Sequence, residues 1–223
     1  MMKLLDDIYV YEWTNPLANN CNSYYIGGNV RAIIDPGLEE YLPGLLKNMT
    51  EDGIDAGDVK YIINTHSHPD HYEASGSFSD PDIKIGLNDK EMEFFEMAGA
   101  EMFRWFGLNP PEIRTDIILK EGSITLGDET FKILLTPGHS PGSISLYQEN
   151  GKILFSGDVI FDHNVGRTDF PGGDAALLKE SIQTLAKLDI DYLLPGHMGI
   201  VQGNDNVKEN FQTVIKNIFP YIF

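Results

Sequence analysis

Short runs of β-branched and aromatic residues alternate with turn residues through most of the chain, and these runs predict strands. In the first part of the chain, they are bounded by Gly, Pro, Asn or Asp and cover residues 23–27, 30–35, 59–65 and 83–88. In the second part, runs of the same kind cover residues 115–120, 123–127, 130–136, 143–148, 152–157 and 190–195. The hydrophobic pattern therefore predicts a chain rich in short strands.

Helical spacing of apolar residues separates some of these runs. It predicts helices over residues 39–54, 89–107, 175–188 and 205–219. For the second helix, Asn88 is the expected N-cap, and Glu91 three residues later matches a capping box. Sheets with helices in both halves and no linker between them predict one layered α/β domain over residues 1–223.

The helix over 89–107 is unusually rich in Met and aromatic residues, and most of them are expected to pack on a sheet. That stripe consists of residues 92, 95, 99, 102, 103 and 106. Phe94, Met97 and Trp105 fall off the stripe. They are candidates for a substrate entrance or for a contact in a homodimer.

The charge balance of the chain excludes several kinds of partner. Its formal net charge is −18 and its basic residues are scattered, so we expect neither nucleic acid nor an anionic membrane surface as a partner. Cys21 stands alone, which rules out an internal disulfide and fits a reducing compartment. Asp6 and Asp7 interrupt the first apolar run, and no run is long enough to span a membrane. We therefore expect a cytoplasmic protein.

Histidine and aspartate side chains follow the ends of four predicted strands. Loops at strand ends of layered α/β folds can aim side chains into a common crevice. The densest cluster is THSHPDH, directly after the strand over 59–65. The residues placed in this way are His66, His68, Asp70, His71, His139, Asp158 and His197.

Imidazole and carboxylate groups in this number suit one or two metal ions. Neutral imidazole and carboxylate bind zinc, iron or manganese, and a dinuclear site needs about twice the ligands of a single catalytic metal. A buried histidine without a partner is costly, so a cluster of this density favours metal binding. His163 is isolated in FDHNVG, and we interpret it as structural.

The motifs HSHPDH at 66–71, PGHSPGS at 137–143, SGD at 156–158 and PGH at 195–197 resemble the metallo-β-lactamase superfamily over nearly the whole chain. The resemblance implies an αββα sandwich with a metal site at one sheet edge. It also implies that His66, His68 and His139 hold a first metal, that Asp70, His71 and His197 hold a second, and that Asp158 bridges the two.

The loop GRTDFPGGD at 166–174 is similar to the branch that contains glyoxalase II (hydroxyacylglutathione hydrolase) and persulfide dioxygenases. A basic residue of this loop contacts the glutathione carboxylate in glyoxalase II, and Arg167 occupies the matching place. The alternative for Arg167 is an ion pair with Asp162, Asp169 or Asp174. A tyrosine often follows the last metal histidine in glyoxalase II, whereas Met198 and Gly199 stand here.

These motifs lead to one preferred function and two alternatives. We expect a metallo-hydrolase that cleaves a thioester or a related small acyl substrate by hydroxide held between two divalent metals. Zinc is the preferred metal, with iron or manganese as alternatives, and Asp70 is expected to orient the nucleophile or accept a proton. The alternatives are a mononuclear iron persulfide dioxygenase and a non-catalytic metal-binding module.

Overall fold

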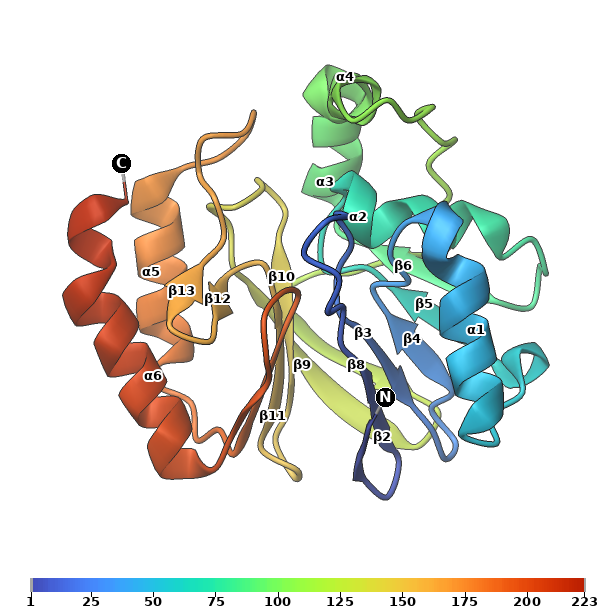
Figure 1. The fold of residues 1–223 in the computed structure, drawn as a ribbon, viewed down its shortest axis with the longest axis horizontal. Helices are drawn as coiled ribbons and strands as arrows, with labels where there is room; N and C mark the ends of the chain where they lie inside the picture. Colours follow the sequence, from blue (N-terminus) through green and yellow to red (C-terminus); the bar gives the residue numbers. More distant parts are fainter. Residues whose placement is uncertain (1, 223) are drawn as a thin grey trace.

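The computed structural model describes residues 2–222 and places most of the strands in two sheets (Figure 1). The first sheet has the spatial order β1-β2-β3-β4-β5-β6-β7, which is also the order of its strands along the chain. Its strands are β1 (Met2–Leu5), β2 (Ile8–Tyr11), β3 (Ser23–Ile26), β4 (Ala32–Ile34), β5 (Tyr61–Ile63), β6 (Lys84–Leu87) and β7 (Ile117–Ile118).

The second sheet comes from the rest of the chain and has the spatial order β15-β14-β11-β10-β9-β8. Its strands are β8 (Gly122–Leu126), β9 (Glu129–Leu135), β10 (Ile144–Gln148), β11 (Ile153–Gly157), β14 (Tyr192–Pro195) and β15 (Val201–Gln202). A two-stranded ribbon of β12 (Ile160–Phe161) and β13 (Asn164–Val165) extends from this half.

Helices lie outside the two sheets. They are α1 (Leu42–Glu51), α2 (Pro69–Tyr72), α3 (Asp89–Phe94), α4 (Ala100–Trp105), α5 (Ala175–Leu185) and α6 (Asn204–Asn217). Shorter turns of helix are η1 (Glu39–Tyr41), η2 (Ala56–Asp58), η3 (Glu73–Ser77), η4 (Phe95–Gly99) and η5 (Phe219–Tyr221). Figure 1 shows α1 on the outer side of the first sheet, and α5 and α6 on the outer side of the second.

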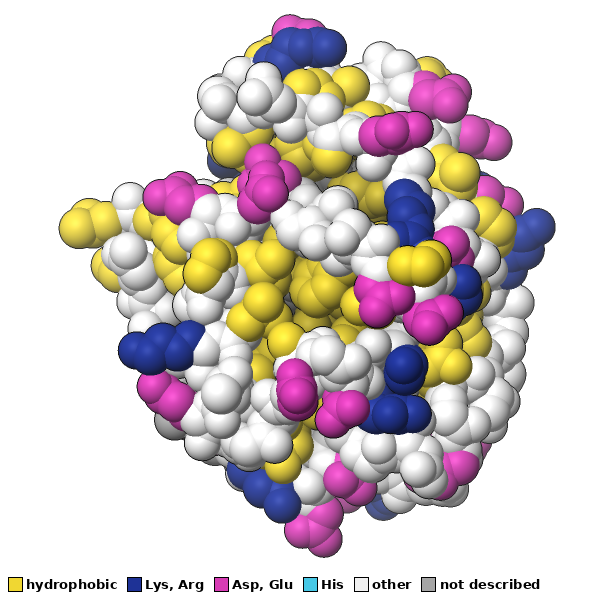
Figure 2. Space-filling model, turned by 90° about the vertical axis from the view of Figure 1, so that its right-hand side faces the viewer, with side chains coloured by type: hydrophobic (Ala, Val, Ile, Leu, Met, Phe, Trp, Pro, Cys, Tyr) yellow, Lys and Arg dark blue, Asp and Glu magenta, His cyan; other side chains and the backbone are white. Residues whose placement is uncertain are grey.

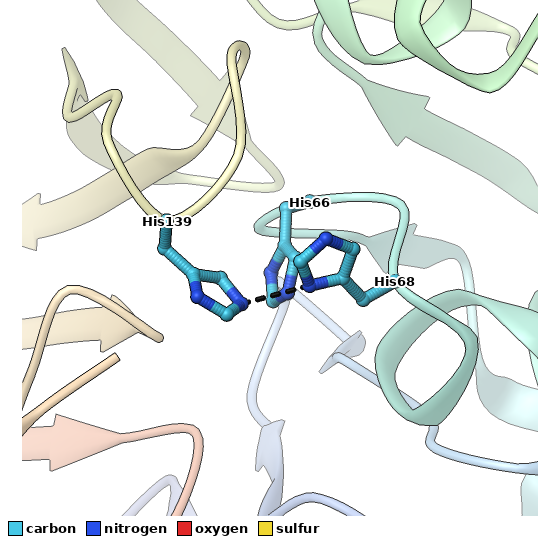
Figure 3. Close-up of side chains that lie close together, drawn as sticks. All are labelled: His66, His68 and His139. Atoms are coloured by element: carbon cyan, nitrogen blue, oxygen red, sulfur yellow. Dashed lines mark hydrogen bonds between the residues drawn. The ribbon is translucent and has the colours of Figure 1, made fainter. Parts of the chain in front are cut away.

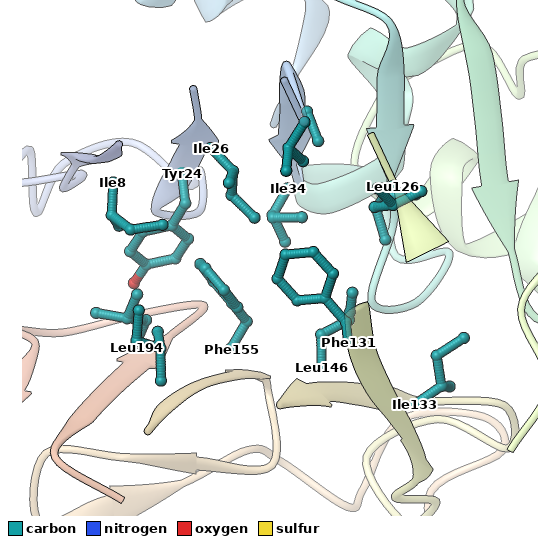
Figure 4. Close-up of a cluster of buried hydrophobic side chains, with 14 of the residues drawn as sticks. Ile8, Tyr24, Ile26, Ile34, Leu126, Phe131, Ile133, Leu146, Phe155 and Leu194 are labelled. Carbon is teal, nitrogen blue, oxygen red and sulfur yellow. The ribbon is translucent and has the colours of Figure 1, made fainter. Parts of the chain in front are cut away.

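The main hydrophobic core lies between the two sheets (Figure 4). It contains Tyr24 of the first sheet and Phe131 and Phe155 of the second, and the rings of Tyr24 and Phe155 meet edge to face at 5.5 Å. One further core lies between the first sheet and α1, and another between the second sheet, α5 and α6. This arrangement confirms the predicted αββα sandwich.

The predicted strands are all present, whereas several short strands were not predicted. The ribbon strands β12 and β13 and the edge strand β15 each have two residues, which is too few for a hydrophobic alternation to stand out. The strand β7 is equally short, but it lies within the longer predicted run at 115–120. The strands β1 and β2 were also missed, because the pattern there was interpreted only in terms of a leader segment. Turn residues Asp6 and Asp7 join these two strands into a hairpin.

The helical segment from Asp89 to Trp105 contains a π-helical turn, η4, that the sequence did not predict. A π turn inserts an extra residue and rotates everything after it about the helix axis. The predicted stripe is wrong at two positions, of which Phe106 follows the π turn and Phe94 precedes it. Phe94, expected off the stripe, is buried at 6% exposure, and Phe106, expected on it, is 45% exposed.

The face of the molecule that lies to the right in Figure 1 is shown in Figure 2. Acidic and basic side chains are scattered over this face, and hydrophobic side chains gather toward its middle. Each helix within residues 2–222 is too short or too polar to cross a lipid bilayer.

Candidate metal centre

Parallel strand pairs deliver the chemically active loops to one edge of the sandwich. The strands β4 and β5 are parallel in the first sheet, and β11 and β14 are parallel in the second. Because β10 is antiparallel to both β9 and β11, β9 runs in the same direction as β11. The carboxyl ends of these strands therefore supply the loops in which the predicted histidines and aspartates lie.

Three of the predicted ligands converge at the first position. His66, His68 and His139 are all buried, and each offers a ring nitrogen within 4.8 Å of the others (Figure 3). His68 Nδ1 and His139 Nε2 lie 2.8 Å apart, which Figure 3 marks with a dashed line. The loops after β5 and β9 thus bring their imidazole rings to one point.

The remaining ligands form a second cluster beside the first. His197 Nε2 lies 3.4 Å from His71 Nε2 and 3.4 Å from Asp70 Oδ2. The carboxylate of Asp158 lies between the clusters, with Oδ2 3.4 Å from His139 Nε2 and 3.2 Å from His197 Nε2. The structure therefore brings all seven predicted ligands together in two adjoining sets, with Asp158 in contact with both.

Three buried polar atoms of this cluster lack the hydrogen-bond partners that such atoms normally have. Within residues 2–222, His66 Nε2, His68 Nε2 and Asp158 Oδ1 are buried side-chain atoms without a hydrogen-bond partner. Such atoms are costly unless a ligand satisfies them. Unpaired imidazole nitrogens and a carboxylate oxygen form a donor set that suits divalent transition metals, so the residues present fit a metal centre.

Hydrogen bonds behind the ligands fix which ring nitrogen faces the cluster. His71 Nδ1 lies 2.9 Å from Asp35 Oδ2, and His139 Nδ1 lies 2.7 Å from the Arg167 carbonyl oxygen. Each Nδ1–H donates to these oxygens, so Nε2 is the ring nitrogen that faces the cluster and binds a metal once it carries no proton. Asn19 Nδ2 donates to Asp70 Oδ2 at 3.0 Å and orients that carboxylate in the same way.

The electrostatics of the metal-free cluster act differently on its histidines. Burial lowers the pKa of His66 and of His68 well below the usual value, and the neighbouring histidines lower it further, so both rings are neutral at pH 7. Burial would lower the pKa of His71 and of His197, but neighbouring acidic groups, Asp158 among them, outweigh burial and raise it, so a metal has to displace a proton from each ring. Burial alone would raise the pKa of Asp158, but His197 and His71 outweigh burial and hold it well below its usual value. The carboxylate of Asp158 is therefore ionised and attracts cations.

Close packing of two ligand loops requires a glycine next to His197. A Cβ atom at Gly196 would lie 2.2 Å from Asp158 Oδ1 and 2.7 Å from His71 Cε1. Side chains larger than hydrogen would therefore push the loop after β14 away from the cluster. This close contact explains why glycine precedes His197 in the PGH motif.

The cluster opens into a pocket of about 350 Å³, within the usual range for small-molecule sites. Arg167 lines this pocket, and its guanidinium donates to both carboxylate oxygens of Asp169 at 2.8 and 2.7 Å. The positive charge of Arg167 is thus paired, which agrees with the alternative of an ion pair given from the sequence. His163 lies away from the cluster, is exposed, and contacts Asp162.

Asp35 and Asn19 are functional candidates that the sequence analysis did not single out. Asp35 directly follows the strand β4, which is the same strand-end position that revealed Asp158. It accepts from Thr65 N and Thr65 Oγ1, both at 2.7 Å, in addition to holding His71. The strand-end rule could have found Asp35, whereas Asn19 lies in an irregular loop without such a signal.

Comparisons with known proteins agree with this geometry. Residues 17–197 match the family model of the metallo-beta-lactamase superfamily. A probable metallo-hydrolase of Methanocaldococcus jannaschii is 36% identical over 197 residues, which cover 82% of this chain and 90% of the relative. The hydroxyacylglutathione hydrolase GloC of Haemophilus influenzae is 36% identical over 189 residues, covering 80% of this chain and 84% of the relative.

A solved structure of similar sequence also carries metal. It is described as a di-iron-bound form, is 31% identical, and superposes with a TM-score of 0.69. The match covers 85% of this chain and 92% of that chain. The chain is thus similar to a protein whose structure holds iron.

Proposed function

The chain belongs to the metallo-β-lactamase superfamily and is a metal-dependent hydrolase, and we propose that it cleaves small thioesters with two zinc ions. The likeness to the hydroxyacylglutathione hydrolase GloC supports a thioester substrate, since hydroxyacylglutathione is itself a thioester. The clusters of three ligands on either side of Asp158 support a dinuclear centre.

The choice of a thioester rests on the side chains that line the pocket, because they determine which leaving groups can be protonated. Among the described residues that line the pocket, Arg167 is the sole titratable side chain outside the two ligand clusters, and it is paired with Asp169. The pocket thus offers no free general acid to protonate a departing amine or alcohol. A thiolate needs no such proton, because the pKa of a thiol is about 8.5.

Two divalent cations, when bound, supply a Lewis acid and a water of lowered pKa. His66, His68 and His139 would hold one of them, Asp70, His71 and His197 the other, and Asp158 would contact both. The chain's own contribution is to hold these side chains at fixed positions. Asp35 and the Arg167 carbonyl do so through the Nδ1 atoms of His71 and His139.

Asp70 and Asn19 stand on the open side of the cluster and orient the reactants. Burial would raise the pKa of Asp70, but hydrogen bonding with His197 and the charge of His71 hold it below its usual range. Its carboxylate is therefore ionised at neutral pH and can accept a hydrogen bond from the attacking water. Asn19, which donates to Asp70 and lines the pocket, keeps that carboxylate in place.

Thiol release and oxygen uptake, measured on the same preparation, test this proposal. The zinc-loaded chain is expected to release thiol from a small thioester under nitrogen, because hydrolysis needs only water and a Lewis acid. Zinc cannot change its oxidation state, so it cannot support a dioxygenase. Oxygen consumption that depends on persulfide, in a preparation that contains one iron and no zinc, would contradict the proposal and establish the dioxygenase alternative.

A further inference from the structure

The wall of the pocket next to the ligand clusters is apolar and comes from four separate segments. Its residues are Met102 and Phe106 at α4, Phe161 and Val165 of the ribbon, Phe170 of the loop at 166–174, and Met198 after β14. We call this set the apolar wall. Figure 1 shows α4 and the loop at 166–174 at the same end of the molecule.

Phe170 joins the apolar wall to the candidate metal centre. Its ring lies 6.0 Å from the ring of His68 and 6.2 Å from that of Phe106, nearly perpendicular to each. Edge-to-face contacts at these distances are favourable for aromatic rings. We call the part of a substrate that extends from its reacting carbon an arm. An arm that extends from a carbon beside His68 therefore contacts the ring of Phe170.

The charge of Arg167 does not make this surface a site for an anion. Its guanidinium makes two hydrogen bonds to Asp169 and lies 4.2 Å from the centre of the Phe170 ring. Asp169 occupies two of the donors of Arg167 and offsets its charge, which weakens the attraction of Arg167 for a ligand carboxylate. Phe106 and Met198, at 45% and 46% exposure, instead leave apolar surface open to water.

We propose that the apolar wall binds a neutral, apolar arm of the thioester substrate, and that Phe106 and Phe170 determine this preference. The proposal rests on the function proposed above and adds the chemical class of the substrate to it. Burial of each methylene of such an arm against the wall is expected to raise kcat/KM about threefold to fourfold.

Two series of thioesters on the zinc-loaded chain test this preference and identify the arm. In one series the acyl chain grows from acetyl to hexanoyl on a fixed neutral thiol, and in the other the thiol grows on a fixed acetyl group. We expect kcat/KM to rise with length in one series, and arms that end in a carboxylate to react at least about tenfold more slowly than neutral arms. Phe106→Ala and Phe170→Ala should flatten the rise, whereas Trp105→Ala, exposed on the same helix outside the pocket, should keep it.

A flat response in both series, or a preference for arms that end in a carboxylate, would overturn the proposal while thiol release continued. The second of these results would assign Arg167 the carboxylate-binding role suggested by the resemblance to glyoxalase II. Failure to release thiol from any thioester would instead overturn the proposed function, and the preference with it.

A second inference concerns Glu91, a buried carboxylate that the proposed mechanism does not use. Asn88 does cap α3, since its side chain accepts from Lys90 N. The predicted capping-box role of Glu91 is wrong, however, because its carboxylate turns inward and is fully buried. Its Oε2 accepts from Ser67 N at 2.8 Å and Ser67 Oγ at 2.6 Å.

The other oxygen of Glu91 holds a different ligand loop. Oε1 accepts from Ser140 Oγ and from Gly142 N, both at 2.6 Å. Ser67 stands between His66 and His68, and Ser140 directly follows His139. One carboxylate therefore ties the loop after β5 to the loop after β9, through four short hydrogen bonds.

We infer that Glu91 is a positioning residue that sets the separation of His139 from the pair His66 and His68. Hydrogen bonds to a charged acceptor are shorter and stronger than neutral ones, which makes this link stiff. Groups that orient metal ligands from behind typically change metal affinity by about 10-fold to 100-fold when they are replaced. The same loss is expected for zinc at the first ligand cluster.

Glu91→Gln keeps the shape of the side chain but turns one acceptor oxygen into a donor that faces two donors. We expect zinc affinity, measured by competition with a chelator, to fall about 10-fold to 100-fold. The visible absorption spectrum of the cobalt-loaded chain should also change, because the ligand geometry changes. Glu93→Gln, a matched change at an exposed neighbour on the same helix, should alter neither.

A folded Glu91→Gln variant with the zinc affinity and cobalt spectrum of the parent would overturn this inference. If that variant does not fold, Ser67→Ala and Ser140→Ala decide, since each removes one of the four donors. Weaker zinc binding in both variants would support the positioning role, and parental zinc binding in both would refute it.

Discussion

Replacing Asp158 with asparagine is expected to lower kcat for thiol release about a thousandfold or more, which is the largest effect that the structure predicts. The carboxylate lies within 3.2 Å of His71 Nε2 and His197 Nε2 and 3.4 Å from His139 Nε2. It is thus the group that both ligand clusters share. Asparagine has almost the same shape but lacks the charge that two cations require.

Metal content and kinetics of the Asp158→Asn variant check this expectation together. The variant should stay folded by circular dichroism and bind fewer metal ions per chain than the parent. Asp162→Asn provides the matched control, because Asp162 is exposed and contacts His163 away from the clusters. Parental metal content and parental kcat in Asp158→Asn would show that Asp158 has no role as a shared ligand.

Removal of metal is expected to lower the melting temperature by about 8–16 °C. A ligand that binds only the native state, at about a thousand times its Kd, stabilises by about 4 kcal/mol. For a domain of this size, each kcal/mol corresponds to about 2–4 °C. Without metal, His66 Nε2 and His68 Nε2 remain buried and unsatisfied, so the metal-free fold carries that cost.

Calorimetry before and after treatment with a chelator measures this difference, and elemental analysis verifies that metal has been removed. Added zinc should restore the original melting temperature, which separates the loss of metal from damage to the chain. An unchanged melting temperature after verified removal would mean that the clusters do not couple metal binding to folding.

The strand-end pattern in the sequence was enough to gather the candidate ligands, and the hydrophobic pattern predicted a layered α/β domain. The αββα sandwich itself was implied by the resemblance of the motifs to the metallo-β-lactamase superfamily. The strand-end pattern is informative because parallel strands end at the same edge of a sheet, so a histidine or aspartate that follows each strand lies at that edge. His139 and His197 are 58 residues apart in sequence, yet Asp158 lies within 3.4 Å of a ring nitrogen of each. The local pattern carried this information without any knowledge of tertiary contacts.

The features that the sequence did not predict depend on tertiary packing. Glu91 fits a local capping box, but its carboxylate instead accepts hydrogen bonds from Ser67, Ser140 and Gly142. No periodicity of hydrophobic residues marks the π turn at Phe95–Gly99. Because of this turn, Phe106 lines the pocket and not the core, where the sequence predicted it. Both deviations lie beside the candidate metal centre, where functional constraints outweigh local preferences.

Titration of the metal-free chain with zinc under nitrogen, followed by thiol release from a small thioester, tests the central claim most directly. A metal-dependent hydrolase with two ligand clusters should be inactive without metal and gain activity with zinc, levelling off near two zinc ions per chain. Thiol release by the verified metal-free chain at the rate of the zinc-loaded chain would contradict the claim.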